Sequence, residues 1–211
     1  MKQILMLGLD RKSKGAREKT KQEKARIGNH AQTQSHQRSI HPEETIGDIS
    51  DMHIWTINDW EKILQKDIAR RTGIRFRYDK DVHFEVKRAF SQFAIWLRTQ
   101  YYFPLRVVVY VKGTNTIRTQ DGENVVGSFF EPYSYLDEPF IKIATGDYDK
   151  LVTDLGNDNA LASILLSLAH ELTHYYQWIN NIPLTPIGRE RQATRYANYI
   201  IDEYSLTRDH P

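Results

Sequence analysis

Apolar residues recur at helical spacing over two stretches in the first half of the chain, and each predicts an amphipathic helix. The first stretch starts at Thr56, a predicted N-cap with Asp59 three residues later, and continues through Ile68 to Gly73. The second contains four aromatic residues and ends before Pro104. Its apolar positions are Phe84, Val86, Phe90, Phe93, Ala94, Trp96 and Leu97.

The second half of the chain predicts three further helices. A short one covers 147–155, and a long one covers 158–180 with Asn157 or Asp158 where an N-cap belongs. A breaker-rich loop separates the long helix from a last helix over 189–204. The apolar stripe of the long helix, which predicts that it packs against a core, is formed by Leu161, Ile164, Leu165, Leu168 and Leu172.

Three short runs between these helices are rich in β-branched or aromatic residues and predict strands. They cover 105–111, 125–130 and 140–145, with turn residues between them. We therefore expect an α+β fold, with the helices packed on a small, mostly antiparallel sheet of three or four strands. The run 140–145 is a candidate open edge that an extended peptide would join through main-chain hydrogen bonds; the alternative is an ordinary antiparallel strand.

Charge divides the chain into two regions. Nine basic residues face three acidic ones between Asp10 and Ile40, where large apolar residues are almost absent. We expect residues 1–50 to be a basic, disordered segment and residues 51–211 to form the folded domain. The alternative is an arm that binds nucleic acid, but the arm lacks the interleaved aromatic residues that stack on bases.

Composition limits both the compartment and the chemistry. The start of the chain has an apolar run too short for a signal peptide, and no other stretch approaches the length of a membrane span, so we expect a cytoplasmic protein without a membrane partner. The 211 residues include no cysteine. Any metal site must therefore use histidine and carboxylate ligands, and a cysteine nucleophile is excluded.

One short motif carries the strongest chemical signal. His170, Glu171 and His174 read H-E-x-x-H within the predicted long helix. Two histidines four residues apart lie on one helical face and can hold a single zinc ion, while the glutamate reaches the water that the ion binds. The motif predicts a zinc hydrolase in which Glu171 is the general base. A catalytic zinc commonly takes three protein ligands, so a third is expected on the last helix.

In its last helix the chain resembles the small gluzincin metallopeptidases, in particular the ImmA/IrrE-type minimal domains. Their last helix typically reads E-x-E-A-x-x-(F/Y)-A, and residues 190–197 match it at every fixed point but one. The resemblance covers roughly 55–204 in element order and rests on two helices in residue identity. It implies a zincin-like domain, a Zn²⁺ cofactor, a peptide or protein substrate, and a glutamate of the last helix as the third ligand.

The exception concerns that third ligand. The family's ligand is the glutamate before the alanine, and this chain has Gln192 there. Glu190 lies at helical spacing from Ala193 and Ala197, which favours an inward-facing carboxylate, so we take Glu190 first, Gln192 as an attenuated ligand second, and Glu203 third. The alternative interpretation is that Glu190 is a solvated residue beside Arg189 and Arg191.

The leading hypothesis is a zinc-dependent peptidase. A tyrosine hydroxyl is expected to support the developing oxyanion; among the four tyrosines near the motif and on the last helix we favour Tyr196. Gln192 sustains a different hypothesis, a catalytically impaired pseudo-peptidase that binds protein partners. A third hypothesis, a nucleic-acid-associated protease similar to SprT/Spartan proteins, requires a third histidine ligand, and only His210 follows His174.

Overall fold

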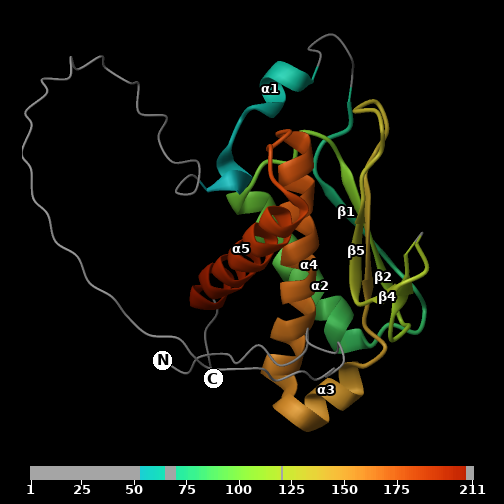
Figure 1. Cartoon of the computed structure of the whole chain (residues 1–211). Coiled ribbons are helices and arrows are strands. Elements are labelled where there is room, and N and C mark those ends of the chain that lie inside the picture. The colour runs from blue at the N-terminus through green and yellow to red at the C-terminus, as the bar shows by residue number, and fades with distance from the viewer. Residues whose placement is uncertain (1–52, 65–69, 120, 208–211) are drawn as a thin grey trace, which may run out of the picture. The chain divides into compact units, whose positions relative to one another are not determined.

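The structure is a computed structural model that describes residues 53–64, 70–119 and 121–207. Figure 1 shows these residues as ribbons. The predicted basic segment, residues 1–50, lies outside the described residues, and so do Ile68 and His210. The described residues all belong to the predicted folded domain.

Four strands form one sheet in the order β1 (Ile74–Tyr78), β2 (Val107–Lys112), β6 (Phe140–Ala144) and β5 (Gly127–Phe130). The pairs β1–β2 and β2–β6 are parallel, and only β5–β6 is antiparallel. The prediction of a mostly antiparallel sheet is therefore wrong, although the mixed α and β composition is confirmed. A separate hairpin joins β3 (Ile117–Arg118) to β4 (Asn124–Val125).

One of the two parallel pairs involves β1, a strand that the hydrophobic pattern did not predict. The alternating run Ile-Arg-Phe-Arg-Tyr of β1 follows Gly73, and helix α2 (Phe84–Gln100) connects β1 to β2. A strand, a crossover helix and a second strand in one sheet give parallel neighbours. The predicted helix over the second apolar stretch is confirmed as α2, which begins at His83 as N-cap and ends at Tyr101.

The strand proposed as an open edge is an interior strand. β6 pairs with β2 on one side and with β5 on the other, so its backbone groups are used on both sides. The edge next to β6 is formed by β5 instead. The prediction failed because strand order depends on long-range packing, which a local pattern does not contain.

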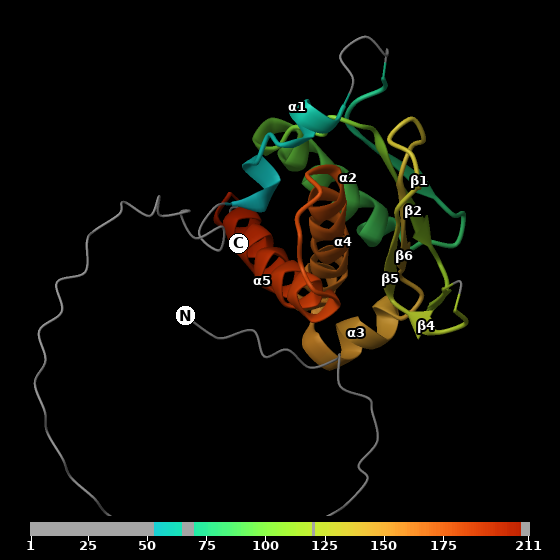
Figure 2. The ribbon, with the colours of Figure 1, turned by 45° about the horizontal axis from the view of Figure 1, so that its top comes forward.

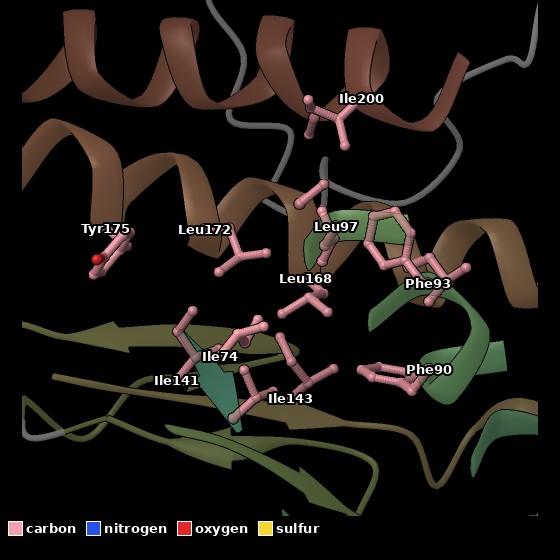
Figure 3. Packing of buried hydrophobic residues seen from close by; sticks show 14 of the residues in the cluster. Ile74, Phe90, Phe93, Leu97, Ile141, Ile143, Leu168, Leu172, Tyr175 and Ile200 are labelled. Carbon is pink, nitrogen blue, oxygen red and sulfur yellow. The ribbon is translucent and has the colours of Figure 1, made fainter. Parts of the chain in front are cut away.

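The longer helices cover one face of the sheet, called here the inner face. Figures 1 and 2 show α2, α4 (Asn157–Ile179) and α5 (Pro186–Leu206) on the same side of it. The register aligns Phe76, Val109, Ile141 and Phe129 across the inner face. Leu168 and Leu172 of α4 point toward Ile141 and Ile143 in Figure 3, and Ile200 of α5 lies on the other side of α4. Helix α4 is thus sandwiched between the sheet and α5.

The predictions for the second half of the chain hold with small shifts. α3 (Tyr148–Leu155) corresponds to the short helix, and α4 and α5 to the two long ones. The N-cap of α4 is Gly156, at φ 81°, so the prediction of Asn157 or Asp158 is wrong by one or two residues. Glycine accepts this left-handed backbone without strain, and Asp158 falls in the first turn, where a negative charge is favourable.

Within the helix predicted from Thr56 to Gly73, the described residues form one short piece, Trp60–Ile63. Thr56 ends the 3-10 helix η1 (Ile54–Thr56), and Asp59 precedes α1 (Trp60–Ile63), so they do not form a capping box. Long-range contacts determine the conformation of this segment. Trp55 is buried, and its Nε1 donates a hydrogen bond to Thr173 Oγ1 of α4 at 3.1 Å. The chain is thereby anchored directly behind the H-E-x-x-H motif.

No helix among residues 53–64, 70–119 and 121–207 combines the length and the apolarity that a membrane-spanning helix requires.

Candidate metal centre

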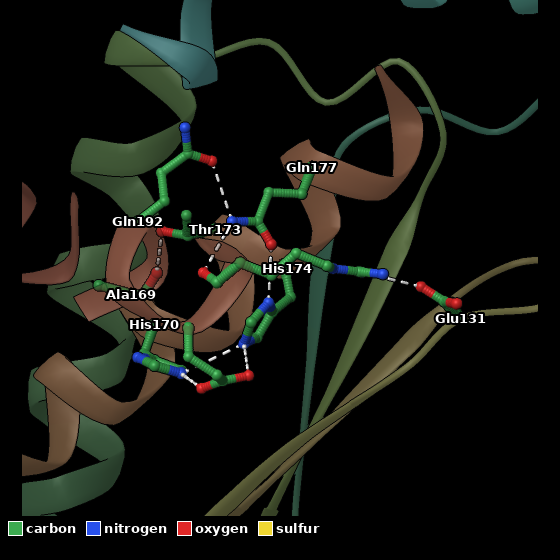
Figure 4. A network of polar contacts seen from close by, with 9 residues as sticks. Glu131, Ala169, His170, Thr173, His174, Gln177 and Gln192 are labelled. Atoms are coloured by element: carbon green, nitrogen blue, oxygen red, sulfur yellow. Dashed lines mark hydrogen bonds and ion pairs between the residues drawn. The ribbon is translucent and has the colours of Figure 1, made fainter. Parts of the chain in front are cut away.

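Helix α4 carries the H-E-x-x-H motif along its middle turns. His170 and His174 lie one turn apart, with ring centroids 4.9 Å apart and ring planes at 79°. Their Nε2 atoms are 3.2 Å from each other, and Figure 4 shows the two rings side by side. Because the apolar stripe of α4 is packed into the core, the helix is held rigidly and both rings are fixed from behind.

Glu190 of α5 completes the cluster. Its Oε2 lies 3.3 Å from His170 Nε2, and its Oε1 lies 3.3 Å from His174 Nε2. The start of α5 is set locally by Pro186 in its first turn and by Thr185, whose hydroxyl caps the helix by accepting from the Gly188 N–H. The structure thus brings together the two motif histidines and the glutamate that the sequence ranked first.

Two small residues let α5 approach α4 closely enough for this contact. Ala193 and Ala197 are fully or almost fully buried on the face of α5 that also carries Glu190. At the start of α5, Arg189 Nη2 makes an ion pair of 3.1 Å with Glu131 Oε2, just beyond the end of β5. The pair ties the Glu190 turn to the edge of the sheet.

The spacing of these three residues fits a metal ion. Their ligand atoms all lie within 4.8 Å of one another, so the group could hold a metal ion. A tetrahedral zinc site with bonds of about 2.0–2.1 Å places its ligand atoms about 3.3 Å apart. The closest approaches, 3.2, 3.3 and 3.3 Å, are of that order, and each oxygen of Glu190 makes one of them. Glu190 is 66% exposed, so one side of the group is open to solvent.

Burial keeps the two imidazoles in the form that binds metals. It lowers the pKa of His170, and the neighbouring His174 lowers it further against the charge of Glu190. Burial also lowers the pKa of His174. A neutral imidazole offers a lone pair at Nε2, whereas a protonated one does not, so this environment favours ligation near neutral pH.

Gln177 fixes the orientation of His174. Its Oε1 lies 2.8 Å from His174 Nδ1, which makes Nδ1 the protonated nitrogen and leaves Nε2 free to act as a ligand. Its Nε2 donates to Gln192 Oε1 and to the Arg189 carbonyl, each at 3.0 Å (Figure 4). Gln177 is buried, so both ends of its amide are held in place.

Gln192 takes part in this network through its side-chain oxygen. Its side-chain oxygen accepts from Gln177, one step behind His174, while Glu190 meets both histidines. The interpretation of Gln192 as an attenuated ligand stays a prediction, and Glu190 is the group that contacts both histidines in this structure. Gln192 thus belongs to the hydrogen-bonded network behind His174, two residues along α5 from Glu190.

Glu171 lies deep beside the two ligands. It is 8% exposed, and burial first and then the charge of Glu190 raise the pKa of its carboxyl to about 8, against a backbone hydrogen bond with Phe129 that lowers it. The carboxyl of Glu171 therefore responds to the charge of Glu190. The backbone hydrogen bond connects it to β5, the edge strand.

Gly127 of β5 makes room for Glu171. A Cβ atom at this position would lie 2.9 Å from Glu171 Oε1, 3.1 Å from its Cγ and 3.2 Å from Ile143 Cδ1. Contacts this short force a shift in the glutamate. A glycine in a strand is otherwise unfavourable, so its presence here reflects the close approach of the carboxylate.

The remaining candidates lie elsewhere. Glu203, the third-ranked ligand, accepts from Tyr101 Oη at 2.8 Å and from Tyr199 Oη at 2.6 Å, so the structure places it in a separate cluster on α5 and its ranking as a ligand is wrong. Tyr196 packs edge-on against the His53 ring, with centroids 5.1 Å apart. Its role in stabilising an oxyanion stays a prediction.

Sequence reasoning missed Gln177 and Gly127. Each left a weak signal. Gln177 is the one amide in an apolar helix end three residues after His174, a spacing that brings side chains onto one face, and Gly127 interrupts a run of strand-forming residues.

Comparison with known proteins adds no family to this picture. No family model matches the chain, and neither a curated protein nor a solved structure matches it. The resemblance of two helices to the minimal gluzincins thus stays an expectation, and the residues of the site have to carry any functional conclusion.

Proposed function

We propose that the protein is a zinc-dependent peptidase that uses Glu171 as its general base. The observation that carries the proposal is the cluster of His170, His174 and Glu190, whose ligand atoms lie within 4.8 Å of one another, with the buried carboxyl of Glu171 next to His170 in the sequence. Two histidines and a carboxylate are a donor set used by catalytic zinc in peptidases, and they leave a fourth position for water or substrate. The exposed side of Glu190 is where a substrate would enter.

The metal and the glutamate divide the chemistry. When bound, a zinc ion supplies a Lewis acid for the scissile carbonyl and lowers the pKa of water toward about 7. A dication beside Glu171 also favours the charged form of that carboxyl, against the burial that raises its pKa in the metal-free chain. The Glu171 carboxylate then accepts a proton from the attacking water and donates it to the leaving amine.

The edge strand supports a peptide as the substrate. β5 lies at the end of the sheet, and among the described strands it pairs only with β6. An extended peptide gains main-chain hydrogen bonds by lying along such an edge. Because Gly127 and Phe129 of β5 both touch Glu171, a peptide on this strand would have its backbone next to the general base.

The test removes the proton acceptor and leaves the ligands. Glu171→Gln is expected to reduce cleavage of a quenched-fluorescent peptide library by about a thousandfold or more, because general base catalysis is lost. The same protein should keep near-stoichiometric zinc, measured by inductively coupled plasma mass spectrometry. Glu123→Gln, the same change at an exposed position in a turn, is the matched control and should cleave like the natural chain.

Two results would overturn the proposal. One is protein purified without chelators that neither contains zinc nor takes it up. The other is a Glu171→Gln variant as active as the control. The pseudo-peptidase hypothesis depended on Gln192 as a degraded ligand, and that position is now accounted for by its bond to Gln177, so no observation favours it.

A further inference from the structure

The outer face of the four-stranded sheet, opposite the helices, carries two complete cross-strand rows. The register aligns Arg77, Tyr110, Lys142 and Ser128 in one row. It aligns Arg75, Val108, Phe140 and Phe130 in the other. In Figures 1 and 2 the helices lie on the opposite side of the sheet, against the inner face. These rows are about 6.6 Å apart along the strands, since each strand rises about 3.3 Å per residue.

Every charge on the strands of the described residues is positive. The six strands contain five basic residues and no aspartate or glutamate; the basic residues are Arg75, Arg77, Lys112, Arg118 and Lys142. Asp79, just beyond β1, neutralises Lys112 at 3.1 Å. Arg75 and Arg77 are exposed, and neither makes an ion pair with another described residue. The outer face thus presents unneutralised cations beside one another.

Three aromatic rings lie between these cations and remain partly exposed. Phe130 and Phe140 are stacked, with centroids 4.5 Å apart, and Tyr110 meets Phe140 edge-on at 6.0 Å. Lys142 Nζ lies over Phe130 at 4.8 Å, and Lys112 Nζ lies 5.9 Å from the Tyr110 centroid. Partly exposed rings flanked by ammonium groups can stack on a planar ligand while the cations meet its negative charge.

The positive charge of the outer face narrows the range of molecules that could bind to it. A second copy of the chain would bring the same cations against themselves, and the segment between Asp10 and Ile40, with nine basic and three acidic residues, would be repelled as well. An acidic peptide would match the charge but would leave the flat aromatic row without a partner of its own shape. Unpaired nucleotides match both features, because each has a phosphate and a base with a π face.

We propose that the outer face of the sheet binds single-stranded nucleic acid through Arg75, Arg77 and Lys142 to phosphates and through Tyr110, Phe130 and Phe140 to bases. A four-stranded sheet with exposed aromatic residues holds about two or three bases. Lys142 leaves the ring of Phe130 when a base stacks there, and its ammonium is then free to meet a phosphate. Duplex nucleic acid hides its base faces, so it binds this surface more weakly.

The experiment measures the fluorescence anisotropy of a labelled thymidine oligonucleotide, about 15 nucleotides long so that it exceeds the width of the sheet, against the full chain at low salt. Arg75→Glu/Arg77→Glu is compared with Arg191→Glu/Arg195→Glu, which makes the same charge change at exposed positions of α5. The first double variant should bind at least about tenfold more weakly than the second. The basic N-terminal segment is present in both, so its contribution cancels.

A second pair tests stacking. Tyr110→Leu should weaken binding by about fivefold or more, and Tyr110→Phe should bind like the natural chain, because the ring and not the hydroxyl meets the base. Addition of EDTA should change nothing, since the metal centre lies on the inner side of the sheet, and this separates the proposal from the peptidase activity.

Several results would overturn the proposal. They are no binding at low salt, equal loss in the two arginine double variants, and unchanged binding in Tyr110→Leu. Equal affinity for a duplex of the same length, competition by polyglutamate as strong as by the oligonucleotide, or a dimer that Arg75→Glu/Arg77→Glu dissociates would do the same.

Discussion

Helix α5 contributes one glutamate to each of two clusters that combine glutamate with histidine. The two clusters are built in opposite ways. In the candidate metal site, called here the metal-ligand cluster, His170, His174 and Glu190 each offer one ligand atom within 4.8 Å of the others. In the His53 cluster, formed by His53, Tyr101, Tyr196, Tyr199 and Glu203, the glutamate is already bonded by two tyrosine hydroxyls. There the His53 ring is enclosed by tyrosine rings, and neither of its nitrogens has a hydrogen-bond partner among residues 53–64, 70–119 and 121–207.

The difference shows what distinguishes a metal centre from a packed histidine. Both clusters bring a carboxylate near an imidazole, so proximity alone does not separate them. In the metal-ligand cluster, Nδ1 of His174 is bonded to Gln177, and the Nε2 atoms of His170 and His174 face each other and the Glu190 carboxylate. Convergent lone pairs, with the other ring nitrogen occupied, are the feature that a metal requires.

The largest expected difference between the clusters is in zinc affinity. Glu190→Gln should weaken zinc binding by more than about a hundredfold, because a carboxylate ligand is replaced by a neutral amide. Glu203→Gln makes the same chemical change in the His53 cluster and should leave zinc affinity unchanged. Competition with a chromophoric chelator measures both. Similar losses in the two variants would show that Glu190 is not a ligand.

Gly127→Ala should separate catalysis from metal binding. The added methyl group would displace Glu171 while His170, His174 and Glu190 stay in place. Peptide cleavage is expected to fall by about tenfold to a hundredfold, since small misplacements of a general base are costly, and zinc content should not change. A variant with normal cleavage rates would contradict the assignment of Glu171.

Loss of the hydrogen bond that supports His174 should weaken metal binding to a comparable extent. Gln177→Leu removes the acceptor at Nδ1 and is expected to weaken zinc binding by about tenfold to a hundredfold. Gln192→Glu keeps an oxygen that accepts from Gln177 and is the matched control, with a change of less than about threefold expected. A large gain in affinity in the control would restore Gln192 as a degraded ligand.

The smallest expected effect concerns the His53 cluster and pH. Burial lowers the pKa of His53, against the charge of Glu203, so the folded state binds a proton less readily than the unfolded state. Its contribution to stability is present above about pH 6.5 and is lost as the pH falls below that value. His53→Phe keeps a ring among Tyr101, Tyr196 and Tyr199 and should flatten this decline.

Urea unfolding between about pH 7.5 and 5.5 measures this effect. A chelator is present throughout, so that release of metal does not contribute to the change. If the natural chain and His53→Phe lose stability in parallel, the decline has another source. Zinc affinity should be equal in the two proteins, since His53 is outside the metal-ligand cluster.

The parts of the molecule that the sequence predicts are those set by short-range spacing. The i, i+4 spacing of His170 and His174 on α4 needs no tertiary information, and the periodic apolar residues of α2 and α4 define those helices. The strand order was not predictable, because the parallel pairing of β1 with β2 depends on α2 as a crossover. The choice between Glu190 and Gln192 likewise depends on how α5 is rotated against α4, which its helical period alone does not fix.

The contact between Gly127 and Glu171 has an evolutionary consequence. The two residues share one small volume, so a side chain can enter at position 127 only when the carboxylate has moved or has been lost. In descendants of this chain the two positions should therefore change together. A larger residue at 127 would mark a lineage that lacks the proposed general base, even where the two histidines persist.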